Sequence, residues 1–298
     1  MPRILITGAS GMLGAAAINF FHDKDWEIYA LTRTNKIAFP EKCVSIHYGR
    51  IENEEELSVI VKGIPQLDLI IHGAALTNLE TCEADFKAAI NVNTIGTLNL
   101  INSLKGSGRY QEKKPLFVYI SSDAVYPDIE GCKPEKVPVA PASKYGVSKL
   151  WGETVTLKEW PNSLVLRTTI VGNAPRQFAG WVLSAARSNS HLKLFTDVIF
   201  SPLFVTDLCC LIADAHSRGL IGRFNAGSSD PISKADFAIR LLKRAGLTPP
   251  YELTSLQQEP CKAPRSLNMA LDSSKLFAAL EIQPISANET ISKIAVEI

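Results

Sequence analysis

A short apolar run followed by three spaced glycines constrains the fold of this chain more than any other feature. Arg3 to Thr7 is almost entirely apolar, which is typical of a buried parallel strand. Gly8 to Gly14 then follows the pattern G-x-x-G-x-x-G, and Ala15 to Phe21 continues with apolar residues at helical spacing. A strand, a glycine loop and a helix in this order predict a dinucleotide-binding unit of the Rossmann type rather than a plain glycine-rich turn.

Each glycine of this loop has its own expected purpose. Gly8 allows the tight turn, Gly11 lets backbone amides approach a pyrophosphate, and Gly14 lets the helix pack close to the strand. The N-terminus of the helix that follows carries a partial positive charge, which favours the phosphates of a bound dinucleotide.

The second predicted strand, Trp26 to Thr32, bears on the choice of cofactor. In NAD-selective sites an acidic residue at the end of this strand accepts a hydrogen bond from the ribose 2′-hydroxyl. Here the strand runs into Arg33 without an acid. Because a guanidinium pairs well with a 2′-phosphate, we expect NADP(H) to be favoured over NAD(H). The alternative is that Arg33 is only a solvated loop residue.

Further apolar runs predict four more strands. They are Cys43 to Tyr48, Leu67 to His72, Pro115 to Ile120 and Ser163 to Val171. Six strand-plus-helix units in succession are typical of a doubly wound parallel sheet. We therefore expect an α/β Rossmann fold that carries a smaller mixed α/β lid towards the C-terminus.

The regular alternation ends after residue 171, which suggests a division of the chain. We expect residues 1–171 to form the NADP-binding Rossmann domain, with residues 202–227 returning to it. Residues 172–201 and 228–298 would form the substrate-binding subdomain. Helices are expected in this subdomain over Arg176 to Ser190 and over Ser233 to Gly246, where serine and glycine suit the two helix ends.

Composition excludes several classes of partner and site. The chain has 298 residues, of which 46% are hydrophobic, and a net charge of +1, so nothing favours nucleic-acid or membrane binding. The six cysteines lack Cys-x-x-Cys spacing, and we expect reduced thiols and no metal site. The first strand begins at once without a signal peptide, and no apolar run is long enough to span a bilayer. We therefore expect a cytoplasmic protein.

Tyr145 and Lys149 are the strongest candidates for chemistry. Residues four apart on a helix share one face, so the pattern Tyr-x-x-x-Lys places the two side chains together. A neighbouring ammonium favours the phenolate and lowers the pKa of a tyrosine towards neutrality. The pair is therefore interpreted as a proton donor and the group that tunes it. Taken alone the pattern is common, and an ordinary surface Tyr and Lys remain the alternative.

Three other segments are expected near the site. Ser121, Ser122 and Asp123 follow the strand Pro115 to Ile120, at the end where open parallel sheets bind ligands. The small residues Gly73 to Ala75 follow another strand and would let the backbone lie against a cofactor, whereas His72 before them is expected to be a core residue. Asn91 or Asn93, within a helical pattern, would form a buried polar bridge to the strand that carries Ser121.

Together, the glycine loop, Ser122 and Tyr145-x-x-x-Lys149 resemble the extended short-chain dehydrogenase/reductase superfamily. Longer segments are similar to the dTDP-4-dehydrorhamnose reductase branch, and the match runs nearly end to end. These segments are Ala74 to Glu83 followed by Asn91-Val-Asn93, Ser121 to Tyr126, Ser201 to Asp207, and Pro264 to Leu276.

The resemblance implies roles for individual residues. Tyr145 would protonate the developing alkoxide, Lys149 would lower the pKa of Tyr145 and hold the nicotinamide ribose, and Ser122 would hydrogen-bond the substrate carbonyl. The implied cofactor contacts are Gly8, Ser10, Gly11, Met12, Leu13, Gly14, Ala74, Ala75 and Asn93, beside Tyr145 and Lys149. Arg33 is the further cofactor contact expected from the end of the second strand. The implied substrate contacts are Thr77, Asp123 and Arg265, and Arg265 would meet the phosphates of a sugar nucleotide unless it forms a structural salt bridge.

The chain also departs from the pattern it resembles. The reductases usually have an aromatic residue where this chain has Ala124, and often a Trp in the stretch that matches Thr169 to Val171. These departures concern the sugar pocket, so the identity of the sugar stays open. The related dehydratases carry a Glu at the position of Ala124 that takes part in eliminating water, which argues against dehydration here.

The resemblance implies an NADPH-dependent reductase that acts on a nucleotide-activated 4-keto sugar. One alternative is a nucleotide-sugar 4-epimerase, which would use the same residues and retain NAD⁺ through its cycle. An alternative of another class is a non-catalytic NADP-binding subunit that resembles the regulatory beta subunit of methionine adenosyltransferase. Whether the protein forms a homodimer is left open.

Overall fold

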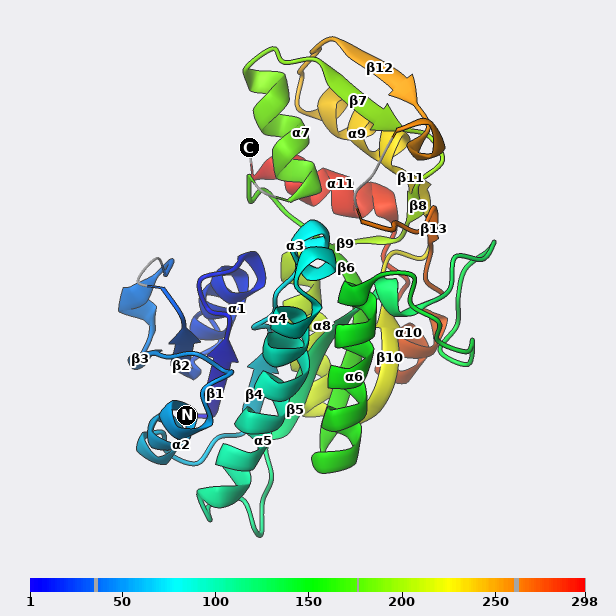
Figure 1. Cartoon of the computed structure of the whole chain (residues 1–298). Coiled ribbons are helices and arrows are strands. Elements are labelled where there is room, and N and C mark those ends of the chain that lie inside the picture. The colour runs from blue at the N-terminus through cyan, green and yellow to red at the C-terminus, as the bar shows by residue number, and fades with distance from the viewer. Residues whose placement is uncertain (35–36, 176, 260–262, 298) are drawn as a thin grey trace. The chain divides into compact units, whose positions relative to one another are not determined.

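The computed structural model describes residues 1–34, 37–175, 177–259 and 263–297. The chain forms two compact units (Figure 1). The first unit comprises residues 1–121, 143–166 and 209–223, and the second comprises residues 122–142, 167–208 and 224–298.

The main sheet is largely parallel, as predicted. Its strands follow the order β10-β6-β5-β4-β1-β2-β3, with β9 paired to β6. The pairs β1–β2, β1–β4, β2–β3, β4–β5 and β6–β9 are all parallel. The strands are β1 (Arg3–Thr7), β2 (Glu27–Thr32), β3 (Ser45–Tyr48), β4 (Leu69–His72), β5 (Leu116–Ser122), β6 (Ser163–Val171), β9 (Pro202–Phe204) and β10 (Gly222–Ala226).

Helices flank this sheet, and several begin where a side chain caps the first turn. Asn53, Asn78, Asp85 and Ser143 each accept a hydrogen bond from a backbone amide two or three residues into a helix. Helix α5 packs against both α2 and α6. The helices are α1 (Met12–His22), α2 (Glu54–Gly63), α3 (Leu79–Ala84), α4 (Phe86–Ile90), α5 (Gly96–Gly106), α6 (Lys144–Glu159) and α8 (Val205–Ser217), with 3₁₀ turns η1 (Pro40–Lys42) and η3 (Asp123–Val125).

One turn between α4 and α5 is π-helical, η2 (Asn91–Ile95). Such turns are rare and occur often at functional sites. It packs against α6.

The core of the first unit joins the sheet to its helices. Leu5, Ile70 and Phe117 on the strands are fully buried against Leu57, Leu100 and other apolar side chains of α2 and α5. Burying each such side chain contributes roughly 1.5–3 kcal/mol.

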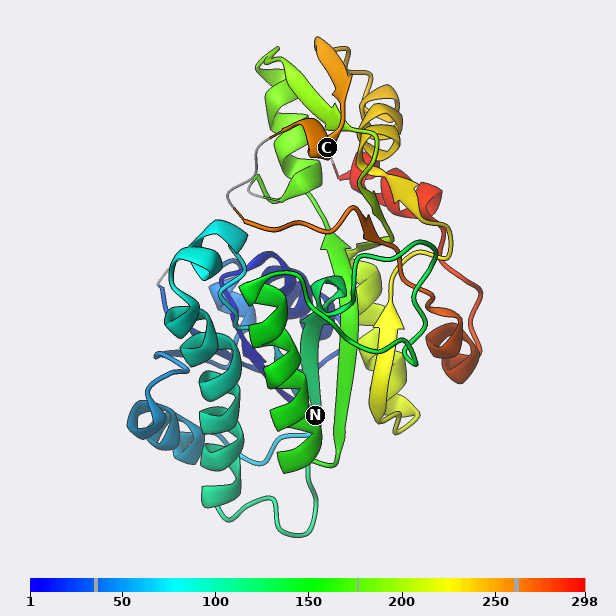
Figure 2. The ribbon, with the colours of Figure 1, turned by 45° about the vertical axis from the view of Figure 1, so that its right-hand side comes forward.

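The second unit is a smaller α/β assembly with two minor sheets. The order β11-β8-β13 forms one sheet, and β7 with β12 forms the other. Helix α9 packs against α7, α11 and β7 (Figures 1 and 2). The elements are α7 (Phe178–Arg187), β7 (Leu192–Phe195), β8 (Ile199–Phe200), β11 (Ile232–Ser233), α9 (Lys234–Arg244), β12 (Tyr251–Thr254), η4 (Leu256–Gln258), β13 (Asn268–Met269), α10 (Ser274–Leu280) and α11 (Ala287–Val296).

The predicted ends of α9 are confirmed. Ser233 accepts a hydrogen bond from the backbone amide of Asp236 at 3.0 Å, and Gly246 just beyond the helix has a φ of +68°. The predicted helix from Arg176 is found as α7, although Arg176 itself lies outside the described residues.

Candidate active site

The glycine loop lies so close to its neighbours that side chains are excluded. Gly8 has a φ of +70°, and a Cβ added there would lie 2.8 Å from the backbone nitrogen of Ala74. A Cβ on Gly14 would lie 2.5 Å from both the Cα of Ala9 and the carbonyl oxygen of Gly8. The loop therefore packs directly on the segment after β4, and α1 packs directly on the loop.

The N-terminus of α1 has the features of an anion site. Its N-cap, Gly11, contributes no side-chain hydrogen bond, and its first turn contains no acidic residue. Ser10 and Gly11 are exposed, Met12 is half-buried, and only the side chain of Leu13 turns into the core. First-turn amides without a capping group, beside a loop too close for side chains, fit the diphosphate of a dinucleotide.

Arg33 follows directly on β2. Its side chain is exposed, while the hydroxyl of Thr32 donates to the carbonyl oxygen of Thr34 at 3.1 Å. Neither neighbour is acidic, so the charge at the end of β2 is positive.

His72 is a buried structural residue, as expected. Its Nδ1 lies 2.8 Å from the hydroxyl of Thr7 and its Nε2 lies 3.0 Å from the hydroxyl of Thr97. Burial, with a further contribution from the nearby Lys149 charge, lowers the pKa of His72 to about 3. The Thr7 hydroxyl also accepts from the amide of Ala74 at 3.2 Å, which holds Ala74 beside the glycine loop.

Asn93 forms a buried bridge, but its side chain bonds a loop and helix α6 rather than the predicted strand. Its Nδ2 donates to the carbonyl oxygen of Leu76 and to the hydroxyl of Ser148, both at 2.9 Å, and its Oδ1 accepts from the amide of Leu76 at 2.7 Å. The link to β5 is weaker, because the Tyr119 hydroxyl donates to the Asn93 carbonyl oxygen at 3.3 Å. With its amide group occupied in this way and 1% exposed, Asn93 positions the segment after Ala75.

Tyr145 and Lys149 share α6, as predicted. Tyr145 is half-buried, whereas Lys149 is 3% exposed and its Nζ lies 4.2 Å from the ring centre of Tyr119. Burial lowers the pKa of Lys149 to about 7, against the opposing attraction of Glu153. Within the first unit, the hydrogen bonds of Asn93 and Ser148 thus connect this helix to the loop beside the glycines.

Glu153, one turn beyond Lys149 on α6, was not predicted as a site residue from the sequence. It is fully buried, accepts a hydrogen bond from the Ser121 hydroxyl at 2.5 Å, and pairs with Nε of Arg223 at 3.2 Å. Its negative charge supports the ammonium form of Lys149. The available clue was spacing, since residues 149 and 153 fall on the same helix face.

Ser122 and Asp123 belong to the second unit and are hydrogen-bonded to each other. The Ser122 hydroxyl donates to Oδ1 of Asp123 at 2.8 Å and accepts from the amide of Ala124 at 3.2 Å. Thr169 donates to the other carboxyl oxygen of Asp123. Burial raises the pKa of Asp123 in spite of these donors and of the nearby charge of Lys234.

The remaining two predicted substrate residues are exposed. Arg265 lies in the second unit, shortly before Leu267 and Asn268, whose backbone amides donate to the carboxylate of Asp128 at 2.9 and 2.8 Å. Thr77 lies in the first unit, just before Asn78, which caps α3.

The cysteines and the helices were also compared with what metal sites and membrane spans require. Cys43, Cys82, Cys132, Cys209 and Cys210 form no disulfide with any described residue, and Cys261 lies outside the described residues. No cluster that could hold a metal occurs in the described part of the chain. Every helix among the described residues is too short or too polar to cross a bilayer.

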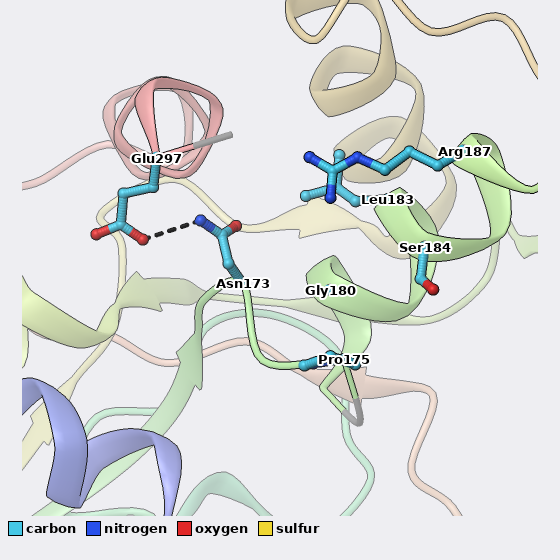
Figure 3. Close-up of a pocket in the computed structure, with 7 residues that line it drawn as sticks. All are labelled: Asn173, Pro175, Gly180, Leu183, Ser184, Arg187 and Glu297. Carbon is cyan, nitrogen blue, oxygen red and sulfur yellow. Dashed lines mark hydrogen bonds between the residues drawn. The ribbon is translucent and has the colours of Figure 1, made fainter. Parts of the chain in front are cut away.

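A hollow of about 240 Å³ lies in the second unit (Figure 3). Its lining residues are Asn173, Pro175, Gly180, Leu183, Ser184, Arg187 and Glu297, and Asn173 donates to Glu297 at 2.9 Å. None of the site residues predicted from the sequence lines it.

The parallel sheet, the glycine loop at the start of α1 and the Tyr145–Lys149 pair on α6 define an oxidoreductase of the short-chain dehydrogenase/reductase type. The family model described as "RmlD substrate binding domain" matches residues 2–298. The chain belongs to this family.

Individual relatives are similar over most of their length. The dTDP-4-dehydrorhamnose reductase of Aggregatibacter actinomycetemcomitans is 25% identical over 299 residues, which cover 95% of each chain. The structure of dTDP-4-dehydrorhamnose reductase from Bacillus anthracis, in complex with NADP, matches with a TM-score of 0.86 and 23% identity, covering 100% of both chains.

A relative of another kind is similar over a shorter stretch. The beta subunit of methionine adenosyltransferase 2 from Danio rerio is 29% identical over 169 residues, which cover 57% of this chain and 48% of that protein.

Proposed function

We propose that this protein is an NADPH-dependent reductase of a nucleotide-activated 4-keto sugar, similar in activity to dTDP-4-dehydrorhamnose reductase. The observation that carries this proposal is the buried Lys149 ammonium, one helical turn from Tyr145 on a helix tied through Asn93 to the loop beside the glycines. Membership in the reductase family and the NADP complex of the Bacillus anthracis relative support it.

The cofactor would bind to the first unit. The amides of Met12 and Leu13, just after Gly11, would hold the diphosphate at the start of α1, and Arg33 would pair with the 2′-phosphate that distinguishes NADPH from NADH. Ala74 and Ala75, held in place through Thr7 and Asn93, would lie along the cofactor. When bound, the nicotinamide supplies the hydride.

Proton delivery is assigned to Tyr145. Its hydroxyl would donate to the substrate oxygen as negative charge develops there, and the Lys149 ammonium would stabilise the phenolate that remains. Lys149 suits this task because it is buried. The electrostatic attraction between an ammonium and a phenolate is stronger where water is excluded. The ammonium form of Lys149 is in turn supported by Glu153.

Ser122 would hydrogen-bond the substrate carbonyl. In the structure its hydroxyl proton points to Asp123, so donation to a substrate requires the hydroxyl to rotate away or the carboxyl of Asp123 to be protonated. The raised pKa of Asp123 favours the second route. Thr77 and Arg265 are proposed as further substrate contacts.

Turnover with candidate substrates tests this function. The purified protein, mixed with NADPH and dTDP-4-dehydrorhamnose, is expected to consume the absorbance of the reduced nicotinamide and to release a dTDP-6-deoxyhexose. A panel of other nucleotide-linked 4-keto sugars, each with NADPH and with NADH, identifies the sugar and the cofactor. Failure to oxidise either cofactor with every member of the panel would refute the proposal.

A regulatory subunit is the second candidate, and the similarity to the methionine adenosyltransferase beta subunit favours it. Such a protein would bind NADP and a synthetase partner without turnover. Affinity purification from the native cell distinguishes a regulatory subunit from a keto-sugar reductase. A stoichiometric synthetase, recovered with a protein that binds NADPH but reduces no keto sugar, would favour the regulatory role.

A further inference from the structure

Lys234, a residue without an assigned role, has an unusual environment in the second unit. It is the first residue of α9, and its backbone amide donates to the carbonyl oxygen of Val198 at 2.9 Å. Its Nζ lies 4.9 Å from the ring centre of Phe178 and 5.9 Å from that of Phe200. The ammonium is thus held beside two aromatic rings and is half-buried.

The ammonium of Lys234 has no hydrogen-bond acceptor or ion-pair partner among the residues that the structure describes. An ammonium has three N–H donors, and withdrawing it from water without acceptors is costly. Aromatic faces offset part of this cost through cation–π attraction but accept no conventional hydrogen bond. Such a group is suited to an oxygen ligand supplied from outside the chain.

The charged side chains around Lys234 indicate whether that ligand is an anion or a cation. Asp123 attracts the ammonium, but its two carboxyl oxygens already accept from Ser122 and Thr169. Arg265 repels it. Two cationic side chains that repel each other are both stabilised by an anion bound between them.

The backbone explains why Lys234 and Arg265 come together. The segment of β8 is the shared support, because Val198 accepts from the amide of Lys234 and Ile199 donates to the carbonyl oxygen of Leu267 at 2.7 Å. Leu267 lies two residues after Arg265, and β13 continues the pairing with β8 (Figure 1). The backbones that carry Lys234 and Arg265 are therefore both joined to the segment at β8.

We propose that Lys234 binds the sugar-linked phosphate of a nucleoside diphosphate sugar, while Arg265 binds its other phosphate. This inference rests on the proposed function. In such a substrate the pyranose ring separates the reacting carbonyl from the glycosyl phosphate, and Lys234 interacts electrostatically both with Asp123, next to the carbonyl-binding Ser122, and with Arg265. Lys234 supplies a point charge to one phosphate, and the planar guanidinium of Arg265 suits a second.

Equilibrium binding of nucleotides tests the assignment without relying on turnover. The dissociation constants of dTDP and dTMP, and of UDP and UMP, are measured by titration calorimetry for the full-length wild type and for Lys234→Gln. Only the diphosphates carry the phosphate assigned to Lys234. Loss of one charge-assisted contact is expected to weaken diphosphate binding about 10- to 100-fold and to leave monophosphate binding unchanged.

Two further variants distinguish the loss of the Lys234 charge from a general change in the structure of the second unit. Lys234→Arg, which keeps the charge, is expected to retain most of the diphosphate affinity. Lys243→Gln removes an exposed lysine from the same helix and is expected to bind as the wild type does. NADPH binding, measured in parallel, is expected to be unchanged in all three variants, which reports intact folding of the cofactor unit.

Several outcomes would overturn the inference. They are unchanged diphosphate binding in Lys234→Gln, equal losses for mono- and diphosphates, and a wild type that binds neither diphosphate. Failure of the proposed function has a different signature, because diphosphate binding that depends on Lys234 would then persist in a protein that reduces no keto sugar.

Discussion

The Nζ of Lys149 lies 4.2 Å from the ring centre of Tyr119, and the hydroxyl of Tyr119 donates to the carbonyl oxygens of Asn93 and Lys149. Burial raises the pKa of Tyr119 well above its ordinary value, so the ring stays neutral and presents its face to the ammonium. Tyr119 on β5 thus stabilises the Lys149 ammonium through its ring face, and Glu153 on the next turn of α6 stabilises it through its negative charge.

Tyr145→Phe is expected to remove the proton donor and leave the cofactor site intact. A positioned general acid contributes typically about 10²–10⁴-fold, so kcat should fall within that range while NADPH affinity changes little. Steady-state kinetics and fluorescence titration of NADPH measure the two quantities. Tyr48→Phe, an exposed tyrosine on β3, serves as the control. A variant that retains full kcat would exclude Tyr145 as the donor.

Lys149 should give the protein a characteristic dependence of stability on pH. Its pKa is about 7 in the folded chain and near the ordinary lysine value of 10.5 when unfolded. Between these values the unfolded chain binds a proton that the folded chain has released, so the free energy of unfolding rises with pH, by at most about 1.4 kcal/mol per pH unit. Below the lower value the buried ammonium is fully destabilising.

Lys149→Met should therefore flatten this rise. Urea unfolding of the wild type and the variant, at several pH values within the window, measures the difference. Lys158→Met, which removes an exposed lysine from the same helix, should keep the wild-type slope. A slope that survives in Lys149→Met would show that another group causes it.

Arg33→Asp should reverse the preference between cofactors. It removes a cation that would pair with the 2′-phosphate of NADPH and adds an acceptor for the 2′-hydroxyl of NADH. The NADPH-to-NADH ratio of kcat/KM is expected to fall by about 10- to 100-fold. Arg240→Asp, an exposed site on α9, controls for the change in net charge. An unaltered ratio would mean that Arg33 is only a loop residue.

Gly14→Ala and Gly63→Ala should have effects of opposite sign. The new methyl group at Gly14 would overlap the backbone at 2.5 Å, and overpacking of this kind typically costs about 1–3 kcal/mol. The methyl group at Gly63, on the last residue of α2, would meet nothing within 4 Å and should stabilise the helix by up to about 1 kcal/mol. Urea denaturation measures both, and equal effects would contradict the packing described for α1.

Asn93→Ala should cost more stability than Asn91→Ala, although the two residues share one π-helical turn. Asn93→Ala leaves the part-buried amide of Leu76 without its acceptor and leaves the Leu76 carbonyl with only the weak Cys82 thiol donor, and a buried group left unpaired costs about 1–3 kcal/mol. Asn91 is exposed, and its loss should be nearly neutral. NADPH affinity should also fall for Asn93→Ala alone, because Asn93 orders the segment that follows Ala75.

Local patterns were sufficient to predict much of the sheet. The bounds of β1 and β6 agree with the predicted runs Arg3 to Thr7 and Ser163 to Val171, and the glycine loop lies where it was expected. Strand runs and glycine spacing depend on neighbours in the sequence, so one chain suffices to recognise them. The pairing of Tyr145 with Lys149 on one helix follows from the same local periodicity.

The partners of the buried charges could not be predicted in this way. Glu153 meets Ser121 and Arg223, which lie 32 and 70 residues away in the chain, and Asn93 meets Ser148 from another helix. No periodicity links such positions, because they become neighbours only when strands and helices pack.

The amino-acid sequence by itself determined the order of strands and helices, the glycine loop and the face that Tyr145 and Lys149 share. Only the tertiary structure decided that Lys149 is buried against Tyr119 and that Lys234 lies beside Phe178 and Phe200 with no acceptor from the described residues. The physical reason is that secondary structure follows from local spacing, whereas the charge state and hydrogen-bonding capacity of a side chain depend on desolvation by distant segments.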